Sequence, residues 1–199
     1  MKEFVIATGN KNKVREISRM LEPLGYTAVS AKEKGIDLDR VVEDGDTFAE
    51  NAYIKAKYAF DLCRCPVIAD DSGLCVDALD GRPGIYSARY GGEELGWEGK
   101  ISLLLGELAD VPDEERTAHF SCAVCCIIDY DTRIEVEGRC DGVIAHEPSG
   151  DGGFGYDPIF TVDGRSFADL SGEEKDSISH RGSAIRMLRD KLLIMLSNQ

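Results

Sequence analysis

Short apolar runs of strand length alternate with segments whose apolar residues recur at helical spacing, and this alternation constrains the fold most. Residues 4–7 form an apolar run typical of a buried strand, and apolar residues then recur every three or four positions over 14–21. The order repeats where Thr47-x-x-Glu50, a helix-capping box, opens a helical segment before a second apolar run at 67–69. Strands interleaved with helices indicate an α/β fold.

The second half of the chain adds a pair of β-rich segments and a terminal helix. Residues 117–130 and 134–140 are β-rich and are separated by a short polar turn, which predicts a long hairpin and therefore a mixed sheet. A helix is expected over 103–108. A second capping box, Ser171-x-x-Glu174, precedes a C-terminal amphipathic helix.

Length and charge narrow the functional classes. At roughly 100–200 residues per domain, the 199 residues are expected to form one domain over 1–199. The formal net charge of −14 argues against nucleic acid and anionic membranes as partners. No apolar run approaches the roughly 18–20 residues of a membrane span, and the first residues lack the pattern of a signal peptide, so we expect a cytoplasmic protein. A small polyanionic substrate fits this acidic chain if its positive charge is concentrated in one place.

Seven cysteines in a chain of this kind are expected to be reduced thiols. The Cys122-x-x-Cys125 spacing is compatible with a zinc or redox site. However, apolar residues alternate through this segment as in a strand, where Cys122 and Cys125 would point to opposite faces. Buried structural cysteines are therefore favoured over a ligand pair.

The loop over 8–13 is a candidate phosphate site. It joins a strand to a helix, so its backbone N–H groups and the helix N-terminus favour an anion, and Lys11 and Lys13 add positive charge. A solvated turn is the alternative, and the spacing of a P-loop is absent.

Adjacent carboxylates indicate a metal site. Asp70 and Asp71 follow the apolar run at 67–69, an awkward place for two negative charges without a cation. Mg²⁺ is usually held by one or two carboxylates together with substrate phosphates. Of the other acidic residues nearby, Glu50 is expected to be the carboxylate of the capping box, whereas Asp44 and Asp46 are expected to be solvated.

Two further segments could recognise a nucleobase. The glycines of 152–158 surround Phe154 and Tyr156, so that a base could lie flat on a ring, although a Gly-rich turn with a core Phe explains the pattern equally. Lys175, His180 and Arg181 lie close to the start of the last helix, where they are either donors to a base edge or ordinary surface charges.

Six ordered motifs, spread over nearly the whole chain, resemble those of the inosine triphosphate pyrophosphatase family. The motifs are Ala7-Thr8-Gly9-Asn10-x-x-Lys13, Glu43-Asp44-Gly45-x-Thr47-Phe48-x-Glu50-Asn51-Ala52-x-x-Lys55-Ala56, Ala69-Asp70-Asp71-Ser72-Gly73-Leu74, Pro83-Gly84-Ile85-Tyr86-Ser87-Ala88-Arg89-Tyr90, Gly153-Phe154-Gly155-Tyr156-Asp157-Pro158 and Glu174-Lys175-x-x-Ile178-Ser179-His180-Arg181-Gly182.

The resemblance implies an elongated α/β fold with a long mixed central sheet flanked by helices, two lobes with a cleft between them, and a homodimer. It implies Mg²⁺ held by Glu43 and Asp71, with Asp71 also the catalytic proton acceptor. The substrate-binding residues that it implies are Thr8, Gly9, Asn10, Lys11, Asn12, Lys13, Lys55, Ser72, Phe154, Gly155, Tyr156, Asp157, Lys175, His180 and Arg181.

The implied reaction is hydrolysis of ITP, dITP or XTP to the monophosphate and pyrophosphate. A 6-keto base would accept a hydrogen bond from a donor such as Arg181, whereas adenine presents a 6-amino donor. The sequence leaves open which carboxylate is the general base and how guanine is rejected. Two rival hypotheses are a nucleotide sensor without catalysis and a pyrophosphatase acting on modified pyrimidine or 7-methylguanine nucleotides.

Overall fold

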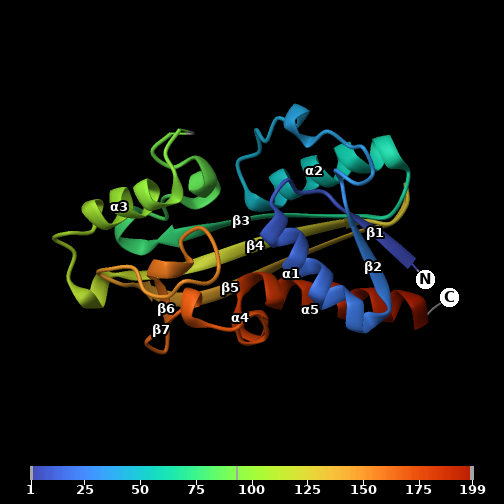
Figure 1. The fold of residues 1–199 in the computed structure, drawn as a ribbon. Helices are drawn as coiled ribbons and strands as arrows, with labels where there is room; N and C mark the ends of the chain where they lie inside the picture. The colour runs from blue at the N-terminus through green and yellow to red at the C-terminus, as the bar shows by residue number, and fades with distance from the viewer. Residues whose placement is uncertain (1, 93, 198–199) are drawn as a thin grey trace. The chain divides into compact units, whose positions relative to one another are not determined.

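The computed structural model describes residues 2–92 and 94–197, which form a mixed sheet with helices packed on it (Figure 1). The strand order is β2-β1-β3-β4-β5-β6-β7. β1 runs parallel to β2 and β3, whereas β6 is antiparallel to β5 and β7. The strands and helices are β1 (Lys2–Ile6), α1 (Lys11–Leu21), β2 (Tyr26–Ser30), α2 (Phe48–Cys63), β3 (Val67–Val76), α3 (Trp97–Glu107), β4 (Thr117–Ile127), β5 (Arg133–Ile144), β6 (Phe160–Val162), β7 (Arg165–Ser166), α4 (Gly172–Ile178) and α5 (His180–Ser197). The predicted α/β fold with a mixed sheet is confirmed.

The described chain divides into two compact units. The first comprises 2–71, 122–138 and 180–197, and the second comprises 72–121 and 139–179. Strands β3, β4 and β5 contribute residues to both units. The single domain and the cleft between lobes stay predictions.

In the first unit, α2 covers one face of the sheet and α1 and α5 cover the other (Figure 1). Side chains alternate between these two cores along each strand, as the pleat of a strand requires. Phe4 packs with α1 and α5, whereas Val5 packs with α2. Cys122 and Cys125 likewise belong to opposite cores, which confirms that they cannot share a metal ion.

The second unit has its own core. Leu74 of β3 and Phe120 of β4 pack with Leu104 of α3 and with the aromatic residues Phe160 and Phe167. The ring centroids of Phe120 and Phe160 lie 4.8 Å apart in an edge-to-face arrangement. This core supports the glycine-rich loop that carries Phe154.

Local signals in the sequence predicted several elements correctly. Both capping boxes are formed, because Thr47 and Ser171 each accept from the backbone N–H three residues on, and Glu50 and Glu174 reach back to the cap. The β4–β5 hairpin is present, and Ile128 N–H donates to Thr132 O (3.0 Å) at its turn. None of the helices over residues 2–92 and 94–197 combines the length and apolar character that a bilayer span requires.

Several predicted boundaries were wrong, and the helix expected over 103–108 runs from Trp97 to Glu107 (α3). The strand expected over 67–69 continues as β3 to Val76, so Asp70 and Asp71 lie within a strand instead of following it. Its parallel pairing with β1 is nevertheless limited to Val67 and Ile68, and so the two carboxylates lie beyond the part that β1 covers. The first helix begins at Lys11, because Asn10 caps it, and therefore Lys11 to Lys13 form its first turn.

Candidate active site

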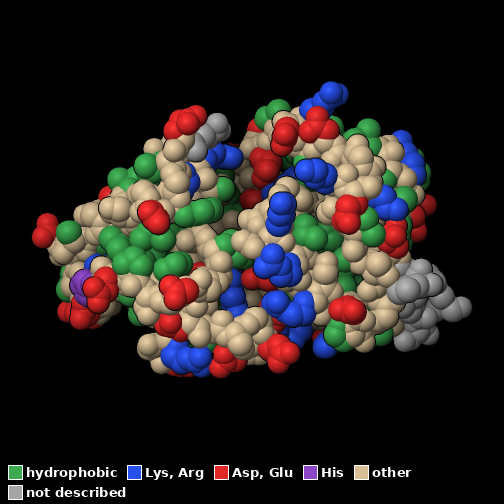
Figure 2. All heavy atoms as spheres, in the orientation of Figure 1, with side chains coloured by type: hydrophobic (Ala, Val, Ile, Leu, Met, Phe, Trp, Pro, Cys, Tyr) green, Lys and Arg blue, Asp and Glu red, His purple; other side chains and the backbone are tan. Residues whose placement is uncertain are grey.

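The segment between β1 and α1 places a cluster of positive charge at the start of a helix. Asn10 Oδ1 accepts from the backbone N–H groups of Asn12 (2.9 Å) and Lys13 (3.3 Å), which fixes the first turn of α1. Lys and Arg side chains gather over α1 on the face that Figure 2 shows. These side chains and the positive end of the helix dipole favour negative charge at the start of α1.

Lys55 of α2 is held between two carboxylates. Its Nζ lies 2.8 Å from Glu43 Oε2 and 2.9 Å from Asp71 Oδ1. Lys55 is 8% exposed, and burial alone would lower its pKa, but the charges of Asp71 and Glu43 outweigh this effect and raise it. The ammonium therefore stays charged and the two carboxylates converge on one point.

Asp70 is the centre of a buried charge network. The side chain is fully buried, and its Oδ2 lies 3.0 Å from Lys13 Nζ and 3.1 Å from Arg181 Nη2. The guanidinium of Arg181 also donates to Glu16 of α1. Two basic and two acidic groups thus compensate one another, as buried charges must.

The two adjacent aspartates differ in acidity. Burial opposes ionisation of Asp70, but the charges of Lys13, Arg181 and Lys55 prevail and lower its pKa well below the usual range. Burial raises the pKa of Asp71, and the nearby charges of Lys55 and Lys13, which lower it, offset this effect only partly. Asp71 is also partly exposed, whereas Asp70 is not. The environment thus keeps Asp70 ionised as a counter-ion and leaves Asp71 the more basic of the two carboxylates.

A close approach of β5 and α5 positions His180 and Arg181. A Cβ atom on Gly138 of β5 would lie 2.1 Å from His180 O and 2.5 Å from Ala184 N, so only glycine lets the helix begin here. Arg181 is 1% exposed and His180 is 4% exposed. The carboxylate partners of Arg181 are those of a structural cation, and contact of either residue with a base stays a prediction.

In the second unit, Asp157 organises the glycine-rich loop. Its Oδ2 accepts from Phe154 N–H (2.7 Å) and lies 2.7 Å from Lys175 Nζ of α4. Gly153 has a φ of +68°, and a Cβ there would lie 2.2 Å from the same oxygen. Lys175 Nζ lies 4.6 Å from the centroid of the Phe154 ring, a cation–π arrangement. One face of the partly exposed ring is therefore covered by the protein's own cation.

Tyr156 belongs to the core of the second unit. The side chain is 2% exposed, and its ring lies 5.4 Å from that of Trp97 in an edge-to-face arrangement. Its hydroxyl donates to Ser87 O (3.3 Å). Its burial makes stacking of a base on this ring less favourable than stacking on Phe154. Ser72 and Gly155 are both partly exposed.

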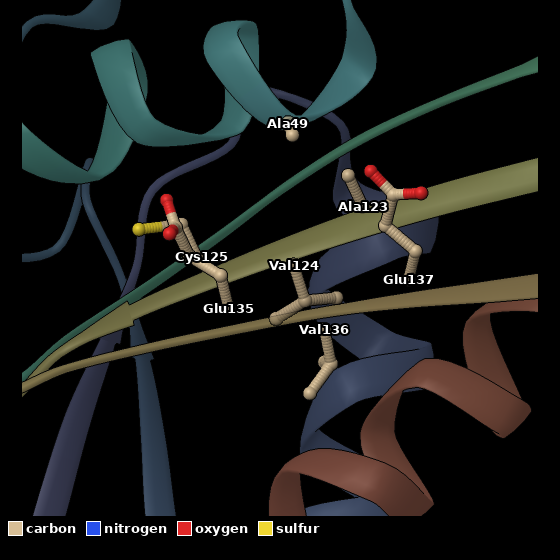
Figure 3. A pocket seen from close by; sticks show the side chains of 7 residues that line it. All are labelled: Ala49, Ala123, Val124, Cys125, Glu135, Val136 and Glu137. Atoms are coloured by element: carbon tan, nitrogen blue, oxygen red, sulfur yellow. The ribbon is translucent and has the colours of Figure 1, made fainter.

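Two hollows in the first unit differ in how well they suit phosphates. One, of 460 Å³, includes Thr8 and Gly9 of the predicted phosphate loop and the cation Lys32, but Asp37 and Asp39 also line it. The other, of 220 Å³, has two glutamates and no basic side chain in its lining, and so it does not suit a triphosphate (Figure 3). It is lined by Ala49, Ala123, Val124, Cys125, Glu135, Val136 and Glu137.

The structure thus brings the predicted site residues into two sets, one in each unit. Lys13, Glu43, Lys55 and Asp71 belong to the first, and Phe154, Asp157 and Lys175 belong to the second. Sequence reasoning missed Glu16. The available signal was its position three residues after Lys13 and beside Ile17, on the apolar side of an amphipathic helix.

The carboxylate set fits a hard divalent cation. Glu43 and Asp71 each place a carboxylate oxygen against the ammonium of Lys55, so the two oxygens point toward the same position. Within residues 2–92 and 94–197, no group of three or more His, Cys, Asp or Glu side chains could hold a metal. Two carboxylates completed by substrate phosphates are the arrangement that Mg²⁺ prefers.

The family model described as the Ham1 family matches residues 4–191. The chain belongs to the Ham1 family. A dITP/XTP pyrophosphatase of Treponema denticola is 49% identical over 188 residues, which cover 92% of this chain and 94% of that protein. A dITP/XTP pyrophosphatase of Escherichia coli (strain K12) is 46% identical over 196 residues, covering 96% and 98%. The solved HAM1 protein from Coxiella burnetii superposes with a TM-score of 0.86 at 37% identity, covering 97% of this chain and 99% of that one.

Proposed function

We propose that this Ham1-family chain is a pyrophosphohydrolase of non-standard purine nucleoside triphosphates, ITP, dITP and XTP. The observation that carries the proposal is Lys55, held between Glu43 and Asp71, beside the Lys13–Asp70 pair. This arrangement combines cations for phosphates with carboxylates for a metal. The names of the relatives, dITP/XTP pyrophosphatase, support the same reaction and substrate class.

We infer that the cofactor is Mg²⁺, with Glu43 and Asp71 as its protein ligands. When bound, the ion would supply positive charge that neutralises the phosphate oxygens. Activity should disappear on chelation with EDTA and return with Mg²⁺. Full turnover in the presence of excess EDTA would contradict this inference.

The protein's own residues divide the remaining tasks of phosphate hydrolysis. Asp71 is partly exposed and has a raised pKa, so it would accept the proton of the attacking water. Water adds across the bond between the α and β phosphates, and the products are the monophosphate and pyrophosphate. Lys13 and Lys55 would neutralise the pyrophosphate as it leaves. Asp70 would hold Lys13 in place.

The base would be recognised by an aromatic ring and by a hydrogen-bond donor. The ring of Phe154 would stack on the purine, while Lys175, over the ring, and Asp157, bonded to the Phe154 backbone, hold it in place. The 6-keto oxygen of hypoxanthine or xanthine requires a donor, which adenine would leave unpaired. Arg181 or His180 would be this donor, and for Arg181 the base would compete with its contacts to Glu16 and Asp70.

A product assay tests the proposal. ITP, XTP, dGTP, dUTP and 7-methyl-GTP are incubated with the protein and Mg²⁺, and both pyrophosphate and orthophosphate are measured. We expect IMP or XMP with pyrophosphate as primary products. IDP with orthophosphate would refute the assignment. Binding without turnover would favour the nucleotide sensor, whereas preference for dUTP or 7-methyl-GTP would favour a related pyrophosphatase.

We further propose that the protein acts as a homodimer in the cytoplasm, without nucleic-acid or membrane partners. Free thiols at all seven cysteines fit a reducing compartment, and the net charge of −14 disfavours polyanionic partners. Light scattering coupled to gel filtration gives the mass of the assembly. A monomer at micromolar concentration would contradict the dimer.

A further inference from the structure

A pair of cysteines occupies the connection between the two elements that carry the proposed catalytic groups. Cys63 is the last residue of α2, the helix of Lys55, and Cys65 lies two residues before β3, the strand of Asp71. Arg64 between them caps the helix with a left-handed backbone, φ +54°. The chain reverses direction here, which brings residues 63 and 65 close together.

Each of the two thiols contacts the backbone of the other cysteine. Cys63 Sγ lies 3.4 Å from the backbone nitrogen of Cys65, which donates to it, and Cys65 Sγ lies 3.1 Å from Cys63 O. Burial raises the pKa of the Cys63 thiol, and contact with the Cys65 side chain is a further cause. The two sulfur atoms therefore lie in the same short turn, each against the other residue.

A cation lies beside the pair. The ammonium of Lys34, which pairs with Glu3 Oε1 (2.6 Å), is close enough to both cysteines for their charges to contribute to its raised pKa. The two sulfurs therefore share one polar surface site.

The other cysteines differ in exposure or in surroundings. Cys122, Cys125, Cys126 and Cys140 are buried, and burial raises the pKa of each thiol. Cys75 is partly exposed, but it belongs to the second unit. Cys63 and Cys65 are the partly exposed thiols that are neighbours in the described chain.

We propose that Cys63 and Cys65 form a reversible intramolecular disulfide when the protein meets a low-molecular-weight disulfide such as oxidised glutathione. One protein thiolate attacks the reagent, forms a mixed disulfide and releases one glutathione thiolate. The second protein thiolate then attacks the protein sulfur of the mixed disulfide and releases the other glutathione. Two protein thiols are oxidised, two glutathione molecules are formed, and the link constrains the connection between α2 and β3.

Peptide mapping tests the proposal directly. Trypsin cleaves after Lys57, Arg64 and Arg89, and Pro83 protects Arg82, so Cys63 and Cys65 fall in separate peptides, 58–64 and 65–89. The folded protein is treated with oxidised glutathione, alkylated, digested and analysed by mass spectrometry. We expect the two peptides joined through sulfur in a monomeric chain, and separated again by dithiothreitol.

Because Cys75 also lies in the second peptide, the experiment is repeated with Cys75→Ser. The joined peptides should persist in Cys75→Ser and disappear when Cys63→Ser is added. Cys65→Ser combined with Cys75→Ser should retain a mixed disulfide on Cys63. Loss of the link in Cys75→Ser, or peptides that are only glutathionylated or alkylated, would overturn the proposal. If Cys75→Ser does not fold, fragmentation of the joined peptides from the unsubstituted chain identifies the linked cysteine.

Discussion

The guanidinium of Arg181, at the start of α5, is paired with the carboxylate of Glu16 in α1. Arg181 also donates to Asp70, so the pair connects the C-terminal helix and the first helix to the strand of the proposed catalytic carboxylate. The network is buried, so removing one of its charges is expected to lower the stability of the fold.

Removing Glu16 is expected to lower stability strongly. Glu16→Ala leaves the buried guanidinium with less compensating charge, and breaking a buried pair costs about 3–5 kcal/mol. Urea unfolding of the variant and the parent measures the difference. Asp61→Asn is the matched control, because Asp61 pairs with Lys57 on the surface, where such pairs contribute at most about 1 kcal/mol. Equal effects of the two substitutions would contradict a structural role for Glu16.

Substitution of the two neighbouring aspartates should have different effects on activity and stability. Asp71→Asn removes the proposed general base, so kcat should fall by about 10²–10⁴ while the protein remains folded. Asp70→Asn removes the counter-ion of Lys13 and Arg181, so stability should fall together with activity. Steady-state kinetics and urea unfolding of both variants separate these outcomes. A well-folded Asp71→Asn with near-normal kcat would exclude both roles proposed for Asp71.

Stability below pH 5 should depend on Glu174, the carboxylate of the α4 capping box. Its hydrogen bonds from Arg165 and from Ser171 lower its pKa to about 2. A lowered folded-state pKa adds stability above the unfolded value of about 4.3, and this stability is lost as the pH falls through the folded value. The melting temperature of Glu174→Gln should therefore depend less on pH between about 5 and 2 than that of the parent. The same pH dependence of the melting temperature in Glu174→Gln and in the parent would contradict the prediction.

Base selectivity should distinguish Phe154 from Arg181. Phe154→Ala should weaken kcat/KM for ITP and ATP by similar factors, because stacking tolerates base identity. If Arg181 donates to the 6-keto oxygen, Arg181→Ala lowers kcat/KM for ITP by about ten- to hundred-fold and narrows the gap to ATP. If Arg181 acts only through Asp70 and Glu16, both substrates lose the same factor. The ITP/ATP ratio of kcat/KM in the two variants decides between these roles.

The sequence by itself determined the elements whose signals are local. The capping boxes at Thr47 and Ser171 satisfy backbone donors within four residues, and so no distant partner is needed to form them. The opposite placement of Cys122 and Cys125 follows from the two-residue repeat of a strand. The motifs also placed the chain in its family before its geometry was known.

Only the tertiary structure decided how the charges are distributed. Asp70 and Arg181 are separated by 111 positions, and Glu16 and Arg181 by 165, so no periodicity predicts that they meet. The apolar run at 67–69 suggested a strand ending before Asp70, and two adjacent carboxylates are costly to bury without a cation. The strand continues because Lys13, Lys55 and Arg181 converge on these carboxylates from three different helices. Burial and charge compensation depend on packed neighbours, and these exist only once the chain has folded.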